Sequence, residues 1–340
     1  MSRACPTRPA LGRPLPMVTP GLFCPIPPRI SPHADAAQNW LTGWMTERGI
    51  AAETAERLRR SGFARYAGRL YPDADETDLR LVTALFTWFF LLDDTVDGDA
   101  APPLHQVRAT VDGVFATIDS DGRQPAPGLS EPMRAMLLDS WRAITGDLSE
   151  MSVDRINDAL RHHLDGILVE ASNKWVGRRP GIVEYIQLRR ATSAAYVSYA
   201  LIEFAGAGRM RIPEAVYHHP VLREISAAGN DLLSWFNDLL SLERDEDVSA
   251  GHNLVLATAR ERGLARDAAT REVIGRWQER MTRFVELRAA VPAFGTRIDA
   301  AVRRYVEGVA DSVRGTIDWS LESPRYPMPT VVEEWVGSRA

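Results

Sequence analysis

Residues 81–92 (LVTALFTWFFLL) form an apolar, aromatic-rich run that ends directly in residues 93–97 (DDTVD). An unpaired carboxylate is costly to bury, so three of them at the end of such a run need an explanation. On a helix, Asp93 and Asp97 share a face, and Asp94 also reaches Asp97. Like charges so placed repel unless a cation lies between them, and crowded carboxylates suit hard divalent ions such as Mg²⁺. A motif this short equally fits a solvated acidic helix end.

The composition is that of an ordinary soluble globular protein, with 45% hydrophobic and 25% charged residues in a chain of 340. The formal net charge of -5 and the lack of a long basic block argue against a nucleic-acid-binding surface. Any anionic substrate must therefore be held by local cations, either metal ions or arginines. The apolar runs are interrupted or too short to span a bilayer, so we expect no stable membrane insertion.

The beginning of the chain differs from the rest in its high proline content. Its cysteines, Cys5 and Cys24, both lie there, so no disulfide framework is expected. No charged segment followed by an apolar one opens the chain, and we therefore expect a cytoplasmic protein. Residues 1–22 are expected to be disordered because prolines prevent a helix, whereas residues 23–27 (FCPIP) carry enough apolar surface to lie along a domain.

From about His33 onward, helical signals dominate. Strong helix formers or apolar residues at helical spacing occur at 34–48, 51–67, 77–96, 103–120, 130–146, 151–173, 181–207, 212–217, 220–245, 250–262, 266–290 and 294–319. Breakers separate these stretches, and no run alternates β-branched residues as a strand does. We predict a single all-α catalytic domain over residues 23–330, followed by a tail of residues 331–340.

A second acidic stretch, residues 230–247 (NDLLSWFNDLLSLERDED), contains the pattern N-D-x-x-S-x-x-x-D twice. The first frame consists of Asn230, Ser234 and Asp238, and the second of Asn237, Ser241 and Asp245. In each frame an amide, a hydroxyl and a carboxylate line one helix face, which suits a hard cation that a substrate completes. The second frame is favoured because Arg244 precedes its acid and its helix runs into a polar segment. For the first frame, polar groups that bridge helices inside a bundle are the better interpretation.

These motifs resemble those of the bacterial class I terpene synthases (terpene cyclases), and the resemblance runs from about Phe23 to Tyr326. The matching segments follow the family's order: the lead-in to the first helix at 23–33 (FCPIPPRISPH), the aspartate-rich motif at 93–97, the diphosphate-sensing segment at 184–192 (EYIQLRRAT), the second metal motif at 237–245 (NDLLSLERD) with 252–255 (HNLV) after it, and the C-terminal Arg-Tyr pair at 319–326 (WSLESPRY). The resemblance implies a helical bundle around a central apolar cavity.

The resemblance also implies the chemistry, which is Mg²⁺-dependent ionisation of an isoprenyl diphosphate and cyclisation of the resulting allylic cation. Three Mg²⁺ ions would be held by Asp93, Asp94, Asp97, Asn237, Ser241 and Asp245. The diphosphate would bind Arg189, Arg244, Arg325 and Tyr326, of which Arg189, Arg325 and Tyr326 would act in catalysis. Arg190 remains an alternative to Arg189 as the sensing arginine. Two positions depart from the family, with Asp245 in place of the usual Glu and Ser193 where a helix-break residue is common.

An apolar, aromatic cavity would stabilise the cation and exclude water. The candidates for its lining are Phe89, Phe90, Trp88, Tyr196, Trp235 and Trp319, and ordinary core packing is the alternative for each. Phe89 and Phe90 are favoured because they precede Asp93 by about one turn, and Trp88 cannot face the cavity together with Phe89. The adjacent pairs His162-His163 and His218-His219 do not share a helix face, so we interpret them as surface or core residues rather than zinc ligands.

Other functions remain open at this point. A chain-elongating prenyl diphosphate synthase would need a second aspartate-rich motif, and a non-catalytic helical metal-binding or interaction protein would need no substrate. Farnesyl diphosphate is the substrate that the resemblance favours, with geranylgeranyl and geranyl diphosphate as alternatives. A homodimer is compatible with the resemblance.

Overall fold

The computed structural model of the protein describes residues 22–96, 102–205, 210–248 and 251–324. Its helices are α1 Ala34–Glu47, α2 Ala52–Arg60, α3 Phe63–Leu70, α4 Glu76–Val96, α5 Leu104–Asp119, α6 Glu131–Thr145, α7 Glu150–Trp175, α8 Ile182–Thr192, α9 Ala195–Ala200, the 3₁₀ turn η1 Leu201–Glu203, α10 Glu214–Tyr217, α11 Pro220–Leu240, α12 Leu242–Val248, α13 Leu254–Arg262, α14 Arg266–Ala289 and α15 Thr296–Glu322. No strand occurs in these ranges, which confirms the predicted all-α fold.

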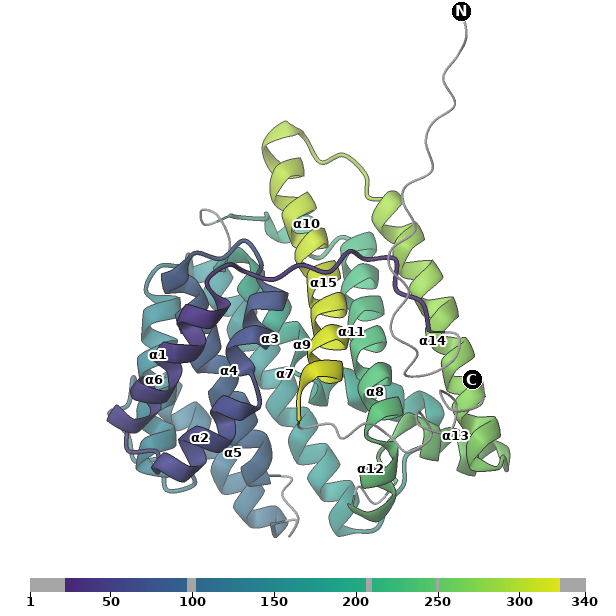
Figure 1. Cartoon of the computed structure of the whole chain (residues 1–340), viewed down its shortest axis with the longest axis horizontal. Helices are drawn as coiled ribbons and strands as arrows, with labels where there is room; N and C mark the ends of the chain where they lie inside the picture. Colours follow the sequence, from purple (N-terminus) through teal and green to yellow (C-terminus); the bar gives the residue numbers. More distant parts are fainter. Residues whose placement is uncertain (1–21, 97–101, 206–209, 249–250, 325–340) are drawn as a thin grey trace, which may run out of the picture.

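The helices form a bundle in which α11 and α15 occupy the middle. Figure 1 shows α1 to α6 gathered on one side and α13 and α14 on the other. Helix α15 packs against both α3 and α11, and α11 packs against α14. None of the helices in the described ranges combines the length and apolarity that a membrane span needs.

Helix α4 is apolar on nearly all sides because it packs against α1, α3 and α6. Trp88 is fully buried and donates its indole N–H to the carbonyl of Met133 on α6 at 3.0 Å. Burial of a large apolar side chain in this way stabilises the folded state by roughly 1.5–3 kcal/mol. The core packing of α4 therefore fixes its last turn, which carries Asp93.

Three predicted helices, over 51–67, 181–207 and 220–245, are each broken in the structure, so these predictions need correction. The first breaks at Gly62 (φ 72°), the second at Ala194 (φ 57°), and the third at Ser241, which closes α11. Tertiary hydrogen bonds satisfy the backbone groups that the breaks release. At the first break, the indole N–H of Trp319 donates to the carbonyl of Ser61 at 2.9 Å.

Residues 22–33 run across the bundle before α1 begins (Figure 1). Cys24 and Ile26 are buried, and Arg314 of α15 donates to the carbonyl of Ile26 at 3.0 Å. Arg29 pairs with Asp311 of α15 at 2.9 Å. The segment is thus held on α15 by both apolar and charged contacts. The sequence prediction of a disordered head falls on residues that, apart from Leu22, lie outside the described ranges.

Candidate active site

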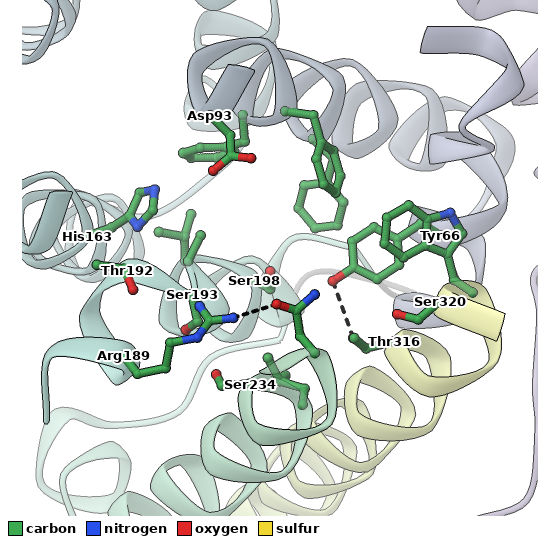
Figure 2. Close-up of a pocket in the computed structure, with 18 residues that line it drawn as sticks. Tyr66, Asp93, His163, Arg189, Thr192, Ser193, Ser198, Ser234, Thr316 and Ser320 are labelled. Atoms are coloured by element: carbon green, nitrogen blue, oxygen red, sulfur yellow. Dashed lines mark hydrogen bonds between the residues drawn. The ribbon is translucent and has the colours of Figure 1, made fainter. Parts of the chain in front are cut away.

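A cavity of about 910 Å³, measured out to the solvent at its mouth, lies among α3, α4, α7, α8, α9, α11 and α15 (Figure 2). Its apolar wall consists of Tyr66, Phe86, Phe89, Phe90, Val197, Leu233 and Trp319. Its polar lining includes Asp93, His163, Arg189 and Asn237. The cavity therefore combines an aromatic interior with a cluster of charged and polar groups.

The aromatic rings of the wall pack on one another. Tyr66 stacks on Trp319 with 4.5 Å between ring centroids, and Phe90 stacks on the buried Phe63 at 4.0 Å. Tyr66 also shares a hydrogen bond with Thr316 of α15 at 3.3 Å (Figure 2). Packed rings of this kind present fixed π faces, which attract positive charge.

The aromatic candidates from the sequence divide into two groups. Phe89, Phe90 and Trp319 line the cavity, whereas Trp88 and Trp235 are buried and do not line it. The prediction for Tyr196 needs correction, because this residue lines a separate groove between α7, α8 and α11. The left-handed backbone at Ala194 restarts the chain as α9, so the helical phase that places Arg189 does not continue to Tyr196.

The aspartate-rich motif lies at the C-terminal end of α4. Asp93 is exposed and lines the cavity together with an adjoining pocket that contains Lys174 and Trp175. Asp94 is half-buried and accepts a hydrogen bond from Arg57 of α2 at 2.9 Å. Asp97 lies outside the described residues. The structure thus gives Asp93 and Asp94 different surroundings, with only Asp93 lining the cavity.

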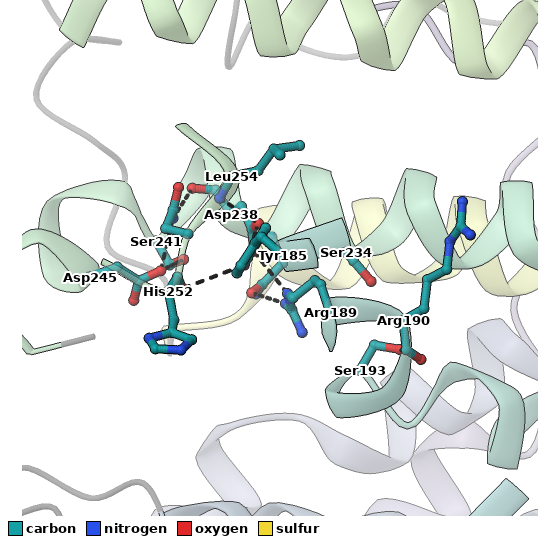
Figure 3. A network of polar contacts seen from close by, with 12 residues as sticks. Tyr185, Arg189, Arg190, Ser193, Ser234, Asp238, Ser241, Asp245, His252 and Leu254 are labelled. Carbon is teal, nitrogen blue, oxygen red and sulfur yellow. Dashed lines mark hydrogen bonds and ion pairs between the residues drawn. The ribbon is translucent and has the colours of Figure 1, made fainter. Parts of the chain in front are cut away.

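The second motif spans the junction between α11 and α12. The backbone N–H of Ser241 donates to the carbonyl oxygen of Asn237 at 2.8 Å, and that of Asp245 donates to the carbonyl oxygen of Ser241 at 2.9 Å, so Ser241 both closes α11 and accepts a bond from α12. The Ser241 hydroxyl donates to Asp245 Oδ2 at 2.5 Å, and Asn253 donates to the same oxygen at 3.0 Å (Figure 3). Arg244 pairs with Asp245 Oδ1 at 3.1 Å. The junction therefore keeps the Ser241 hydroxyl and the Asp245 carboxylate next to each other.

The first frame of the repeated pattern is used in helix packing. Asn230 is fully buried, donates to the carbonyl of Arg190 at 2.8 Å, and accepts hydrogen bonds from Ser193 and Ser234, each at 2.9 Å. Asp238 accepts hydrogen bonds from Tyr185 at 2.7 Å and from the backbone N–H of Leu254 at 3.0 Å (Figure 3). These residues join α11 to α8, the α8–α9 break and α13.

The neighbouring arginines Arg189 and Arg190 point in different directions. Arg189 lines the cavity, donating through Nη2 to Asn237 Oδ1 at 2.8 Å and through Nε to Asp238 Oδ1 at 3.0 Å. Arg190 forms a two-pronged ion pair with the buried Asp231 at 2.7 Å and 2.7 Å. Arg280 donates to the same carboxylate at 2.8 Å. Of the two arginines, only Arg189 lines the cavity, while Arg190 ties α8 to α11.

Some sequence candidates cannot be placed, and some cavity residues were missed. Arg325 and Tyr326 lie outside the described residues. The sequence analysis interpreted His163 as a surface or core residue without a functional role, and its ring is buried at the cavity wall. One sequence signal indicated its burial, because this histidine lies on the same face of α7 as the buried Leu160 and one residue before the buried Leu164.

An oxygen-based metal site fits the residues that the structure brings to this region. Within the described part of the chain, no three His, Cys, Asp or Glu side chains converge on one metal position. Asn237 and Ser241 offer amide and hydroxyl oxygens on the same stretch of chain as the Asp245 carboxylate. A set of carboxylate, amide and hydroxyl oxygens is typical for Mg²⁺ or Ca²⁺ rather than for a softer metal.

Residues 84–283 match the family model described as "Terpene synthase family 2, C-terminal metal binding". The chain is 30% identical over 331 residues to a 4-epi-cubebol synthase of Streptosporangium roseum, covering 92% of this chain and 93% of the relative. It is 29% identical over 316 residues to the 10-epi-cubebol synthase of Sorangium cellulosum, covering 91% and 98%.

Solved structures agree with this match. Wild-type cucumene synthase is 27% identical, has a TM-score of 0.76, and the alignment covers 89% of this chain and all of that one. The fold alone is also shared with a-eudesmol synthase, which is 22% identical with a TM-score of 0.79 and coverage of 89% and 99%. The chain therefore belongs to the terpene synthase family.

Proposed function

We propose that this enzyme is a Mg²⁺-dependent sesquiterpene cyclase that ionises farnesyl diphosphate and cyclises the resulting cation. One observation carries the proposal: a single cavity has an aromatic wall and also contains Asp93, Arg189 and Asn237. The relative from Streptosporangium roseum is named as cyclising (2E,6E)-farnesyl diphosphate, which supports this choice of substrate.

The two acidic motifs are the proposed metal ligands. We assign Asp93, with Asp94 and Asp97 in support, to one part of a three-ion site, and Asn237, Ser241 and Asp245 to the other. When bound, Mg²⁺ supplies Lewis-acid neutralisation of the diphosphate charge, which makes diphosphate a better leaving group. A shorter carboxylate at Asp245 still reaches the motif, because Ser241 and Asn253 both hold its Oδ2 oxygen.

Arg189 is the proposed diphosphate-binding arginine. Its guanidinium is oriented in advance by Asp238, whose carboxylate accepts from Nε at 3.0 Å. A fixed, charged donor stabilises developing negative charge without reorganisation at the moment of reaction. Arg244, Arg325 and Tyr326 are proposed as further diphosphate donors. In the ionisation step, the bond between the allylic carbon and the diphosphate oxygen breaks, and its electron pair leaves with the diphosphate.

The aromatic wall then acts on the allylic cation. Phe89, Phe90 and Trp319 present rings to the cavity, and such rings stabilise a nearby cation by roughly 0.5–2 kcal/mol each. The packed wall also keeps water away from the reactive carbon.

The direct test supplies geranyl, farnesyl and geranylgeranyl diphosphate in turn with Mg²⁺. Released diphosphate is quantified, and organic extracts are analysed by gas chromatography with mass spectrometry. We expect a cyclic C15 hydrocarbon or alcohol from farnesyl diphosphate and no turnover with EDTA. If none of the three substrates releases diphosphate, the proposal is refuted. A longer prenyl diphosphate, formed when isopentenyl diphosphate is added, would instead indicate a chain-elongating enzyme.

A further inference from the structure

His163 lies at the cavity wall but belongs neither to the proposed metal motifs nor to the proposed diphosphate-binding arginines. Its side chain extends from α7 and is only 7% exposed. Figure 2 shows the ring between Asp93 of α4 and Thr192 of α8. The ring also makes an edge contact with Phe89, at 5.7 Å between centroids.

The break between α8 and α9 fixes which nitrogen of this ring carries hydrogen. His163 Nδ1 lies 3.0 Å from the carbonyl oxygen of Ala191, in the last turn of α8. A carbonyl oxygen can only accept, so Nδ1 carries the hydrogen and the neutral ring has its lone pair on Nε2. Nε2 makes no hydrogen bond to any residue in the described ranges. Burial lowers the pKa of His163 to about 4, so the ring is neutral near pH 7.

The other titratable groups that line the cavity, among the described residues, are Asp93, Arg189 and Tyr66. Arg189 is always charged and cannot accept a proton, and the phenol of Tyr66 is a very weak base. Asp93 belongs to the proposed metal motif. His163 is thus the one described lining residue that offers an uncharged basic nitrogen to a cation.

We propose that His163 Nε2 is the proton acceptor that ends the cyclisation. In this step, a C–H bond next to the cationic carbon breaks. Its electron pair forms the C=C bond of the product, and the proton moves to Nε2. The resulting imidazolium keeps its Nδ1–H bond to Ala191 and loses the added proton to water once the product leaves. This inference rests on the proposed cyclase activity.

The test separates ionisation from termination. His163→Asn keeps an N–H donor for the Ala191 carbonyl but has no basic nitrogen, and His163→Ala opens space for an added base. Single-turnover diphosphate release reports ionisation, and product composition reports termination. We expect His163→Asn to release diphosphate within about fivefold of the wild-type rate and to lower the share of the main product about tenfold or more, since loss of a general base typically costs 10²–10⁴-fold.

Two controls distinguish base chemistry from a change of cavity shape. His162→Asn alters the neighbouring residue, which lines the separate groove with Arg190, and should leave the product composition unchanged. In His163→Ala, added imidazole should restore the main product, whereas pyrrole, a ring of similar size without a basic lone pair, should not.

Each contrary result overturns the role of His163. These results are an unchanged main product in His163→Asn, equal restoration by pyrrole and imidazole, or no restoration by imidazole. Retention of the main product in both variants would show that a group other than His163, such as the released diphosphate, accepts the proton. Lack of diphosphate release by the unaltered enzyme would instead refute the proposed function, so the two failures are distinguishable.

Discussion

At the residue scale, Asn230 and Asn237 carry the same side chain two turns apart on α11 but have different surroundings. Asn230 is fully buried, and its amide bridges α8, the α8–α9 break and α11. Asn237 lines the cavity and contacts Arg189. The chemical type of a residue therefore does not determine its role here; its exposure to the cavity does.

Asn237→Ala and Asn230→Ala should consequently fail in different ways. The change at Asn237 should lower kcat/KM by about 100-fold or more, because it removes a proposed metal ligand. The change at Asn230 should leave activity within about tenfold but lower the free energy of unfolding by roughly 1–3 kcal/mol, since buried partners lose their hydrogen bonds. Steady-state kinetics and urea unfolding measure the two effects. Equal losses of activity would show that the first frame, too, serves catalysis.

Asp245 and Glu243 provide a second comparison on one short helix. Asp245 is buried against Ser241 and Asn253, whereas Glu243 is exposed and pairs with Arg266 at 3.6 Å. Asp245→Ala should raise the Mg²⁺ concentration for half-maximal activity by about tenfold or more. Glu243→Ala should not change it. A Mg²⁺ titration of diphosphate release measures both, and identical titration curves for the two variants would contradict the assignment of Asp245.

At the element scale, the α8–α9 break determines which side chains reach the cavity. Ala194 adopts φ 57°, a left-handed conformation that an L-residue avoids. The hydroxyl of Ser193 accepts from the N–H of Ala195 at 3.2 Å and donates to Asn230 at 2.9 Å. These contacts hold the break in place at the end of the segment that carries Arg189.

Substitutions at Ala194 should therefore follow backbone preference rather than size alone. Ala194→Val should lower the free energy of unfolding by about 1–2 kcal/mol or more, because a β-branched residue tolerates this conformation poorly. Ala194→Gly should hold or raise it, because glycine adopts positive φ without steric cost. Thermal unfolding of the variants measures the difference. Higher stability of the valine variant would show that the break is not maintained in solution.

Much of the element pattern, but not its breaks, was predictable from the sequence. The apolar run before Asp93 and the spacing of 237, 241 and 245 indicated helices, and the resemblance of the motifs predicted the family that the comparisons confirm. The breaks at Ala194 and Ser241 were not predicted, since neither position is glycine or proline and hydrogen bonds from distant residues stabilise the first of them. The misplacement of Tyr196 results from the break at Ala194, next to which the carbonyl of Ala191 contacts His163 Nδ1 at 3.0 Å.

At the scale of the whole molecule, residues 22–33 connect the beginning of the described chain to α15 near its end. Asp311 of α15 lies beneath this segment, and its carboxylate accepts from Arg29 at 2.9 Å. Burial raises the pKa of Asp311 to about 7, while the nearby Arg29 acts in the opposite direction. Through this carboxylate, the free energy of unfolding of the protein should depend on pH.

Proton binding by Asp311 determines whether the free energy of unfolding rises or falls with pH. The pKa of Asp311 is near its ordinary value of 3.8 in the unfolded chain and is raised by burial to about 7 in the folded one, so the native state holds more protons between these pH values. This carboxylate should make the free energy of unfolding fall as pH rises from about 4 to about 7. Asp311→Asn removes the ionisation and should flatten that decline, measured by urea unfolding at several pH values. A steeper decline in the variant would reverse the assigned direction.

The hydrogen bond between Arg189 and Asn237 joins the proposed site of the metal ion to the proposed site of the diphosphate. We proposed Asn237 as a metal ligand and Arg189 as a diphosphate donor, and Arg189 Nη2 donates to the Asn237 amide oxygen at 2.8 Å. A cation that replaced this hydrogen bond would free the Nη2 donor for an anion in the cavity. Binding of either ligand would then raise the affinity for the other, and thermodynamic linkage requires this effect to be mutual. Under the proposed roles, the Arg189–Asn237 hydrogen bond would persist until the metal ion and the diphosphate bind together.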